Sequence, residues 1–381
     1  MTTDIQRTMQ EAMRLMQAGD LHAATQAIQD RLRATSGSTC ATGAADNREP
    51  RPGTIEGQYQ RIPDGPAETP EAVWSTAQQA RAPATAPGGE FVAHTFVCEA
   101  GTIEYKLFVP ARLVAASPPL IVMLHGCTQS PDDFARGTRM NALAQEHGYV
   151  VAYPEQSRSR NSGKCWNWFR SHDQKRGQGE PALIAALTRH LVAARGIDER
   201  RVYAAGLSAG GAMAAVLAST YPDIYAAIGV HSGLPFGVAH DLPSALAAMQ
   251  QRPGIKASAK LTQPDRVPAI VFHGDRDTTV TPCNGAAVVA QFAGRDATAD
   301  GNANAPRATV ENGAVAGGRA YTRTVFSNAD GTVAAEQWVI HGAAHAWSGG
   351  DPAGSYTDPS GPNATEHMLR FLSTHKRKAI N

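Results

Sequence analysis

In this 381-residue chain, the sequence around Ser208 is the one that most directly indicates chemistry. Residues Gly206 to Gly210 read GLSAG, the G-x-S-x-G pattern, and they join a predicted strand at 201–205 to a predicted helix at 209–220. The glycines permit a sharp turn that lifts the Ser208 hydroxyl out of a sheet, in the manner of a nucleophile elbow. Ser208 is therefore the predicted nucleophile. The alternative is a glycine-rich helix start in which the serine only caps the helix.

An acid partner for this serine is offered by the segment HGDRDTTV at 273–280, which follows the apolar run AIVF. A buried carboxylate is needed to orient a catalytic histidine and to stabilise its cation. Asp275 and Asp277 compete for this role. Asp275 directly follows a glycine and is typical of a turn, so Asp277 is the predicted acid.

A base is offered by the segment HGAAHAW at 341–347, which follows the strand-like run EQWVI. His341 comes directly after this run, which indicates a structural role, whereas His345 lies on the loop beyond it and could reach the serine. His345 is therefore the predicted base. The resulting chain order is the one found in α/β-hydrolases, not that of trypsin-like or subtilisin-like proteases: Ser208, Asp277, His345.

The segment His125 to Gln129 (HGCTQ) follows the apolar run LIVML and is expected beside the serine turn. Two backbone N–H groups aimed at one point form an oxyanion hole for an ester carbonyl. We expect these donors to be the N–H groups of Cys127 and Ala209. The alternative is an ordinary turn after a strand.

Aromatic residues are concentrated in the segment CWNWF at 165–169, and a further tryptophan follows the predicted base. Trp166 and Trp168 on one side and Trp347 on the other are predicted to wall an apolar substrate site. The alternative is that these rings cap the core.

The elements that would position these residues alternate between strand and helix from residue 91 onward, which predicts parallel βαβ units. Apolar runs predict eight strands, at 91–97, 103–109, 120–124, 150–153, 201–205, 226–230, 269–272 and 336–340. Helices are predicted between them, at 131–147, 181–195, 209–220 and 285–293. The fold class is therefore α/β, with a mostly parallel eight-stranded sheet that carries helices on both faces, in one domain over 91–381.

Two segments precede this domain. Residues 1–33 carry apolar side chains at helical spacing with a Gly-Asp break, which predicts a helical hairpin that packs on the domain, on a second copy or on a partner. Residues 34–90 are rich in proline and glycine with few aromatics, which predicts a flexible linker.

Composition excludes several classes of partner. Lys and Arg total 35 against 34 Asp and Glu, a balance without the basic excess of a nucleic-acid-binding protein. No run of about 18 apolar residues occurs, so no membrane span is expected. The N-terminus lacks the apolar stretch of a secretory signal, so a cytoplasmic location is expected rather than secretion. The sequence contains no CxxC pair, so no metal site is expected, and no cofactor is expected either.

Taken together, LHGCTQSPDDFA, YPEQ, CWNWF, GLSAGGAMA, HGDRDTTV and HAWSGG resemble the polyhydroxybutyrate depolymerase family of serine esterases, which also includes feruloyl and acetylxylan esterases. The resemblance implies an α/β-hydrolase fold, a triad of Ser208, Asp277 and His345, and an oxyanion hole at Cys127 and Ala209. It also admits a disulfide between Cys127 and Cys165, which a cytoplasmic location disfavours.

The expected function is that of a serine carboxylesterase acting on poly- or oligo(3-hydroxybutyrate), with small esters or polymer granules as its partners. One alternative is a feruloyl or acetylxylan-type esterase. An alternative of another class is a non-catalytic binding protein with an α/β-hydrolase-like fold.

Overall fold

The computed structural model describes residues 88–250, 266–294 and 307–377. The predicted helical segment 1–33 lies outside the described residues, and so does the predicted linker except for its last residues, 88–90. The division into head, linker and domain therefore stays a prediction.

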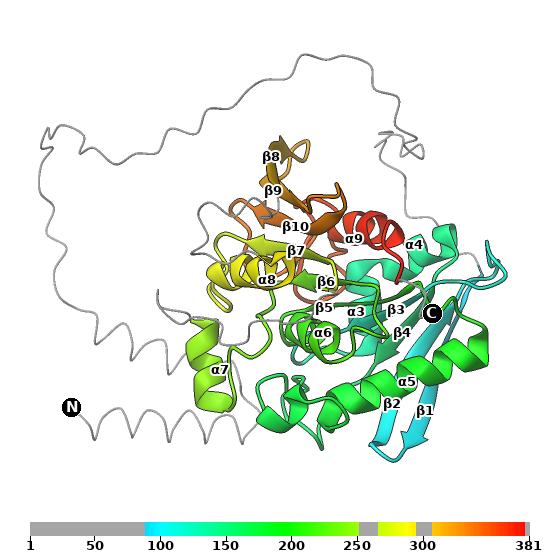
Figure 1. Cartoon of the computed structure of the whole chain (residues 1–381). Coiled ribbons are helices and arrows are strands. Elements are labelled where there is room, and N and C mark those ends of the chain that lie inside the picture. Colours follow the sequence, from blue (N-terminus) through cyan, green and yellow to red (C-terminus); the bar gives the residue numbers. More distant parts are fainter. Residues whose placement is uncertain (1–87, 251–265, 295–306, 378–381) are drawn as a thin grey trace, which may run out of the picture. The chain divides into compact units, whose positions relative to one another are not determined.

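A ten-stranded sheet forms the centre of the domain, in the order β1-β2-β4-β3-β5-β6-β7-β10-β9-β8 (Figure 1). The strands from β4 to β10 in this order are parallel to their neighbours, and an antiparallel pair extends the sheet at each edge. The strands are β1 (Glu90–Cys98), β2 (Gly101–Val109), β3 (Leu120–Leu124), β4 (Val150–Pro154), β5 (Val202–Leu207), β6 (Ala227–His231), β7 (Ala269–Gly274), β8 (Arg307–Ala314), β9 (Ala320–Ser327) and β10 (Val333–Ile340).

The eight predicted strands are all present, and two strands at one edge make the sheet wider than predicted. The additional strands are β8 and β9, and nearly every residue of β8 is exposed. A strand that buries neither face carries no apolar alternation, so its sequence RATVENGA gives no strand signal.

Helices cover both faces of the sheet (Figure 1). On one face α5, α6 and α8 pack against alternate side chains of the strands, and on the other α3, α4 and α9 pack against the remaining ones. The helices are α3 (Pro131–Thr138), α4 (Met140–His147), α5 (Gly179–Arg195), α6 (Ala209–Thr220), α7 (Leu242–Met249), α8 (Cys283–Ala293) and α9 (Ala364–Ser373), with a short 3₁₀ helix η1 (Ser171–Gln174). Among the described residues, no helix is both long and apolar enough to cross a membrane.

One predicted helix is divided in two. Residues 131–147 form α3 and α4 because Arg139 between them adopts a left-handed conformation, with φ of 56°. This turn ends α3 after two turns of helix and redirects the chain.

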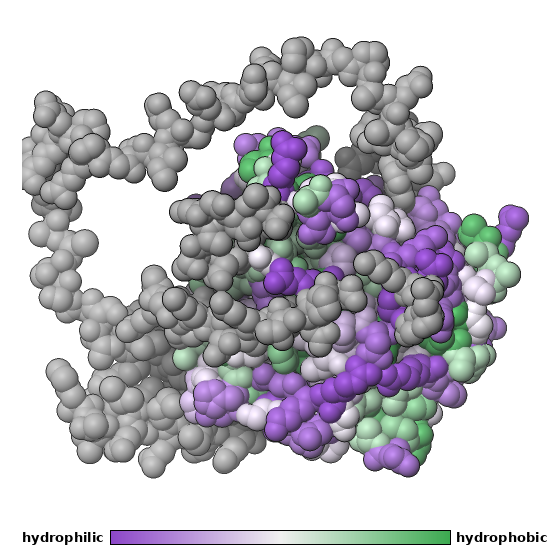
Figure 2. Space-filling model, in the orientation of Figure 1, coloured by the Kyte–Doolittle hydropathy of each residue, from purple (hydrophilic) through white to green (hydrophobic). Residues whose placement is uncertain are grey.

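The surface matches this layering. The outer side of α5 is largely hydrophilic, whereas a hydrophobic area lies over the hairpin of β1 and β2 (Figure 2).

Loops that follow parallel strands emerge at one edge of a sheet. The chain therefore brings together the loops that follow β3, β5, β7 and β10, which carry the candidate residues.

Candidate active site

Ser208 occupies a strained turn between β5 and α6. Its φ of 56° and ψ of −118° lie outside the regions that a serine ordinarily adopts. The Ser208 N–H donates to the His231 carbonyl at 2.8 Å, which fixes the turn from the neighbouring strand β6. A Cβ at Gly210 would overlap the carbonyl oxygens of Leu124 and His125. Only glycine permits this close approach, so the G-x-S-x-G pattern has a steric cause in the packing of α6 against β3.

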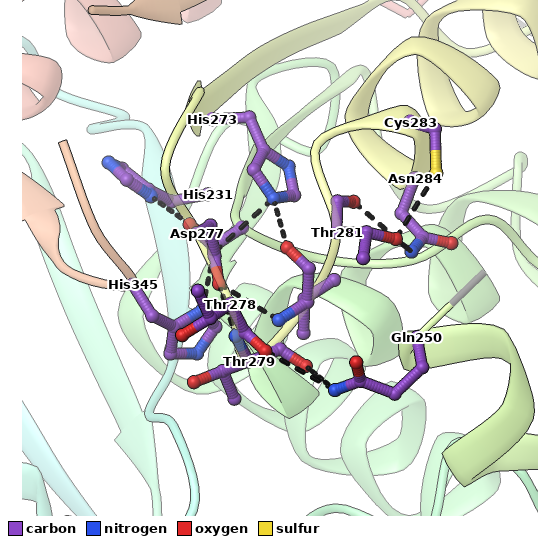
Figure 3. Close-up of polar contacts among 12 residues, drawn as sticks. His231, Gln250, His273, Asp277, Thr278, Thr279, Thr281, Cys283, Asn284 and His345 are labelled. Atoms are coloured by element: carbon purple, nitrogen blue, oxygen red, sulfur yellow. Dashed lines mark hydrogen bonds and ion pairs between the residues drawn. The ribbon is translucent and has the colours of Figure 1, made fainter. Parts of the chain in front are cut away.

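Asp277 and His345 lie in direct contact although 68 residues separate them (Figure 3). His345 Nδ1 donates to Asp277 Oδ2 at 2.6 Å, and the Asp277 side chain is fully buried. The backbone N–H groups of Thr279 and Val280 donate to Oδ1 of the same carboxylate at 2.9 and 2.8 Å. The proton on Nδ1 leaves Nε2 of His345 as the nitrogen that can accept one.

The Asp277 carboxylate is held in its ionised form. Burial by itself would raise the pKa of this carboxyl, but hydrogen bonds from His273 and His345 outweigh burial and hold the pKa well below its usual value. His273 Nε2 shares its proton between the Val280 carbonyl at 2.8 Å and Asp277 Oδ2 at 3.3 Å. A buried anion of this kind can stabilise an imidazolium that forms on His345.

The competing residues Asp275 and His341 form a second pair on the same two loops. His341 Nδ1 lies 2.9 Å from Asp275 Oδ2, and the Gly342 N–H donates to Asp275 Oδ1 at 2.7 Å. This pair is exposed, with 43% of the His341 side chain and 37% of the Asp275 side chain accessible. Burial therefore distinguishes the two pairs and favours Asp277 and His345 for chemistry.

His231 connects the serine turn with the loop that carries His345, a role that the sequence analysis missed. Its carbonyl accepts from the Ser208 N–H, and its Nε2 accepts from the Ser348 N–H at 3.0 Å. The ring stacks between Phe272 and Trp347. Burial holds the pKa of His231 well below its usual value, so the ring is neutral. The only signal in the sequence was a histidine that ends an apolar strand.

The loop after β3 presents the other expected donors. The Gly126 N–H donates to the Gln129 side chain at 2.8 Å, which closes the turn around Cys127. Among the described residues, no backbone hydrogen bond engages the N–H of Cys127 or of Ala209. Both donors are therefore available to a ligand, as an oxyanion hole requires.

A disulfide joins Cys127 to Cys165, which settles that alternative. The loop has further supports, because Trp166 Nε1 donates to the His125 carbonyl at 3.1 Å and the Gln156 N–H donates to His125 Nε2 at 3.1 Å. Burial lowers the pKa of His125 to about 4, so this ring is a neutral acceptor.

The predicted aromatic walls are contradicted. Trp166 and Trp347 are each 1% exposed and Trp168 is 5% exposed. Trp347 donates to Thr365 Oγ1 at 2.9 Å and packs edge-on against Phe134. The indole N–H groups of Trp166 and Trp347 find partners inside the protein, and all three rings belong to the core, which was the stated alternative.

Several known proteins resemble this chain in sequence. The model of the esterase PHB depolymerase family matches residues 103–316, more than half of the chain. Poly(3-hydroxyalkanoate) depolymerase C of Paucimonas lemoignei is 34% identical over 64% of this chain and 58% of its own length. Feruloyl esterase B of Thermothelomyces thermophilus is 32% identical over 47% of this chain and 66% of its own length.

A further sequence relative and one solved structure also resemble this chain. A probable acetylxylan esterase A of Aspergillus fumigatus is 30% identical over 56% of this chain and 59% of its own length. In all three sequence relatives, the match spans less than two thirds of the relative. The structure of an acetyl xylan esterase from Aspergillus awamori superposes with a TM-score of 0.58 at 21% identity, covering 75% of this chain and 99% of that one. This likeness confirms the predicted α/β-hydrolase fold. The chain belongs to the esterase PHB depolymerase family.

Proposed function

We propose that this protein is a serine carboxylesterase in which Ser208 is the nucleophile, His345 the general base and Asp277 the residue that orients the histidine. The observation that carries this proposal is the buried Asp277 carboxylate bonded to His345 Nδ1 at 2.6 Å. The strained Ser208 turn is a second, independent support, because backbone strain of this kind concentrates at functional sites.

The reaction proceeds in two halves. Ser208 Oγ attacks the ester carbonyl carbon while its proton passes to His345 Nε2, and the N–H groups of Cys127 and Ala209 stabilise the resulting oxyanion. The bond from carbon to the alcohol oxygen then breaks as His345 returns the proton to the leaving alcohol. Water, deprotonated by His345, next attacks the acyl-enzyme. The acid leaves, and the proton returns to Ser208 Oγ.

The preferred substrate in this proposal is poly- or oligo(3-hydroxybutyrate). The family match and the name of the Paucimonas lemoignei relative support a hydroxyalkanoate ester. The names of the fungal relatives support the alternative, a feruloyl or acetylxylan-type esterase. The alternative of another class, a non-catalytic binding protein, is disfavoured because a strained serine turn and a buried Asp277–His345 pair have no evident use in binding alone.

The test compares 3-hydroxybutyrate oligomers, methyl ferulate and acetylated xylan, with products identified by mass spectrometry and Ser208→Ala as control. The proposal expects oligomer cleavage to be the fastest reaction and to fall on the order of 10⁴-fold in the variant. Faster turnover of ferulate or acetylated xylan would move the assignment to the alternative esterases. No turnover of any ester by folded protein would support the binding protein.

A further inference from the structure

Among the residues that the structure describes, one aromatic side chain is exposed to solvent rather than buried or half-buried. Tyr356 is 47% exposed and is the only exposed Phe, Tyr or Trp among residues 88–250, 266–294 and 307–377. An isolated exposed apolar residue needs no explanation by itself. The surroundings of Tyr356 are what single it out.

The Tyr356 backbone is fixed in an unfavourable conformation. Its φ of 51° lies in the left-handed region, where a bulky aromatic residue is an outlier. Its carbonyl accepts from the Trp347 N–H at 2.7 Å, and the next residue, Thr357, pairs with Trp347 in the small sheet of β11 (Trp347–Ser348) and β12 (Thr357–Asp358). The backbone at Tyr356 is therefore anchored to the segment that follows His345.

The residue before Tyr356 is anchored to the loop after β3. The Ser355 N–H donates to Asp133 Oδ1 at 2.9 Å, and Gln129 Nε2 donates to the Ser355 carbonyl at 3.1 Å. Gln129 is the same side chain that accepts from the Gly126 N–H. A residue whose backbone is fixed on both sides loses less conformational freedom when a ligand binds to it.

The Tyr356 hydroxyl reaches the residue next to Cys127. It lies 3.3 Å from Thr128 Oγ1, and Thr128 also has a positive φ, of 68°. Thr128 Oγ1 donates its own proton to the Cys127 carbonyl at 2.6 Å, so the tyrosine hydroxyl is the donor in this contact. Tyr356 thus bridges the loop with the expected oxyanion donor and the loop with the expected base.

We propose that Tyr356 is a substrate-contacting residue whose exposed ring packs on the apolar part of the bound ester and sets the preference for chain length. The proposal rests on the proposed esterase function, since it assumes that the ester carbonyl binds between Ser208 and Cys127. It places the aromatic surface that the sequence assigned to three tryptophans on a different residue. A strained backbone that presents an exposed ring, fixed by contacts on both sides of the residue, is the pattern expected of a functional residue.

The experiment measures kcat/KM in two series of esters. The acyl chain varies in p-nitrophenyl acetate, butyrate and hexanoate, and the alcohol chain varies in ethyl and hexyl acetates. The readout in each series is the ratio of the value for the longest chain to the value for the shortest. Tyr356→Ala should lower at least one of these ratios about 10-fold, which is the selectivity that contact with one or two methylene groups provides. Tyr356→Phe keeps the ring and should leave both ratios within about 2-fold of the wild type. Val310→Ala, a change at an exposed apolar residue on the outermost strand β8, is the matched control and should change neither ratio.

A second substitution separates ring loss from backbone strain. Tyr356→Gly removes the ring and also accepts the positive φ without strain. Wild-type ratios in the glycine variant, or the same fold loss on every ester in the alanine variant, would overturn the inference. Labelling of Ser208 by a fluorophosphonate distinguishes the two levels of failure. Unchanged ratios with normal labelling would reject the role of Tyr356 alone, whereas absent labelling and absent turnover in the wild type would reject both.

Discussion

Two Asp–His pairs lie on the same two loops and differ most in burial. Asp277 and His345 form a contact enclosed by backbone donors, while Asp275 and His341 form an accessible contact. A buried carboxylate interacts strongly with a cation because little water screens it, and an exposed one is screened. Asp277 should therefore stabilise a positive charge on His345 far more than Asp275 stabilises one on His341.

Replacing the buried acid is expected to cost far more than replacing the exposed one. Asp277→Asn should lower kcat by about 10⁴-fold, because an amide at this position favours the wrong tautomer of His345. The fold should stay intact. Asp275→Asn should lower kcat by less than about 10-fold, since an exposed contact contributes little. Steady-state kinetics on p-nitrophenyl butyrate, with circular dichroism to verify folding, gives the comparison. A reversed order of the two losses would exclude Asp277 as the orienting acid.

At the residue scale, the sequence predicted those side chains whose chemistry is tied to a strand end. Ser208, Asp277 and His345 each follow an apolar run, and topology brings such positions to one edge. The supporting His231 was not predictable in this way, because its role depends on a carbonyl and a ring nitrogen that contact different loops. The tryptophans were misjudged because composition does not reveal on which side of a loop a ring packs.

At the scale of elements, apolar strands and their following helices were predictable, whereas elements without an apolar pattern were not. Strand β8 has no buried face, which explains why it was missed. Helices α7 and α9 were also missed, although both carry apolar side chains that are buried. The cap of α9 had a local signal, since the Asn363 side chain accepts from the Glu366 N–H. Such short signals are frequent in loops, and only packing against the sheet decides which of them begins a helix.

The loop after β3 is held at several points, and this determines what its disulfide contributes. Besides the bond from Cys127 to Cys165, the Trp166 indole and the Gln156 N–H both bind His125. The remaining supports should keep the loop near its place when the disulfide is reduced. Reduction should therefore lower kcat about 10-fold or less, a partial loss of one oxyanion donor.

The measurement is kcat on p-nitrophenyl butyrate before and after incubation with a phosphine reductant. Cys165→Ser is the control, because a protein without this bond should have the reduced rate at the outset and no response to reductant. A loss above about 100-fold, comparable to complete removal of an oxyanion donor, would show that the disulfide alone holds the loop.

At the scale of the whole molecule, buried neutral histidines make stability depend on pH. Burial lowers the pKa of His125 to about 4 and that of His231 well below its usual value. In the unfolded chain both return to about 6.5, so between about pH 6.5 and 4 the unfolded state binds protons that the folded state does not. Stability is therefore fully present above about pH 6.5 and is lost as the pH falls toward 4.

Burial also lowers the pKa of His367 to about 4. Lowering the pH from 7 to 5.5 should reduce the free energy of unfolding by about 3 to 4 kcal/mol, since each of the three histidines contributes slightly less than about 1.4 kcal/mol, nearly all of it between pH 6.5 and 5.5. The low pKa of Asp277 acts in the same direction, but only below about pH 4. Urea unfolding at the two pH values measures the change. His240→Gln, at a side chain 75% exposed, should leave the slope unaltered. A free energy of unfolding that is equal or higher at pH 5.5 would contradict the buried, neutral state of these rings.

The central claim is that Ser208 is the activated nucleophile, and covalent labelling tests it most directly. The purified protein is treated with a fluorophosphonate, and the modified residue is located by peptide mass spectrometry. The account predicts one equivalent of label on Ser208, no label in Ser208→Ala, and a rate of labelling reduced by orders of magnitude in His345→Ala. Label on another serine of the wild type, or undiminished labelling of Ser208→Ala, would contradict it.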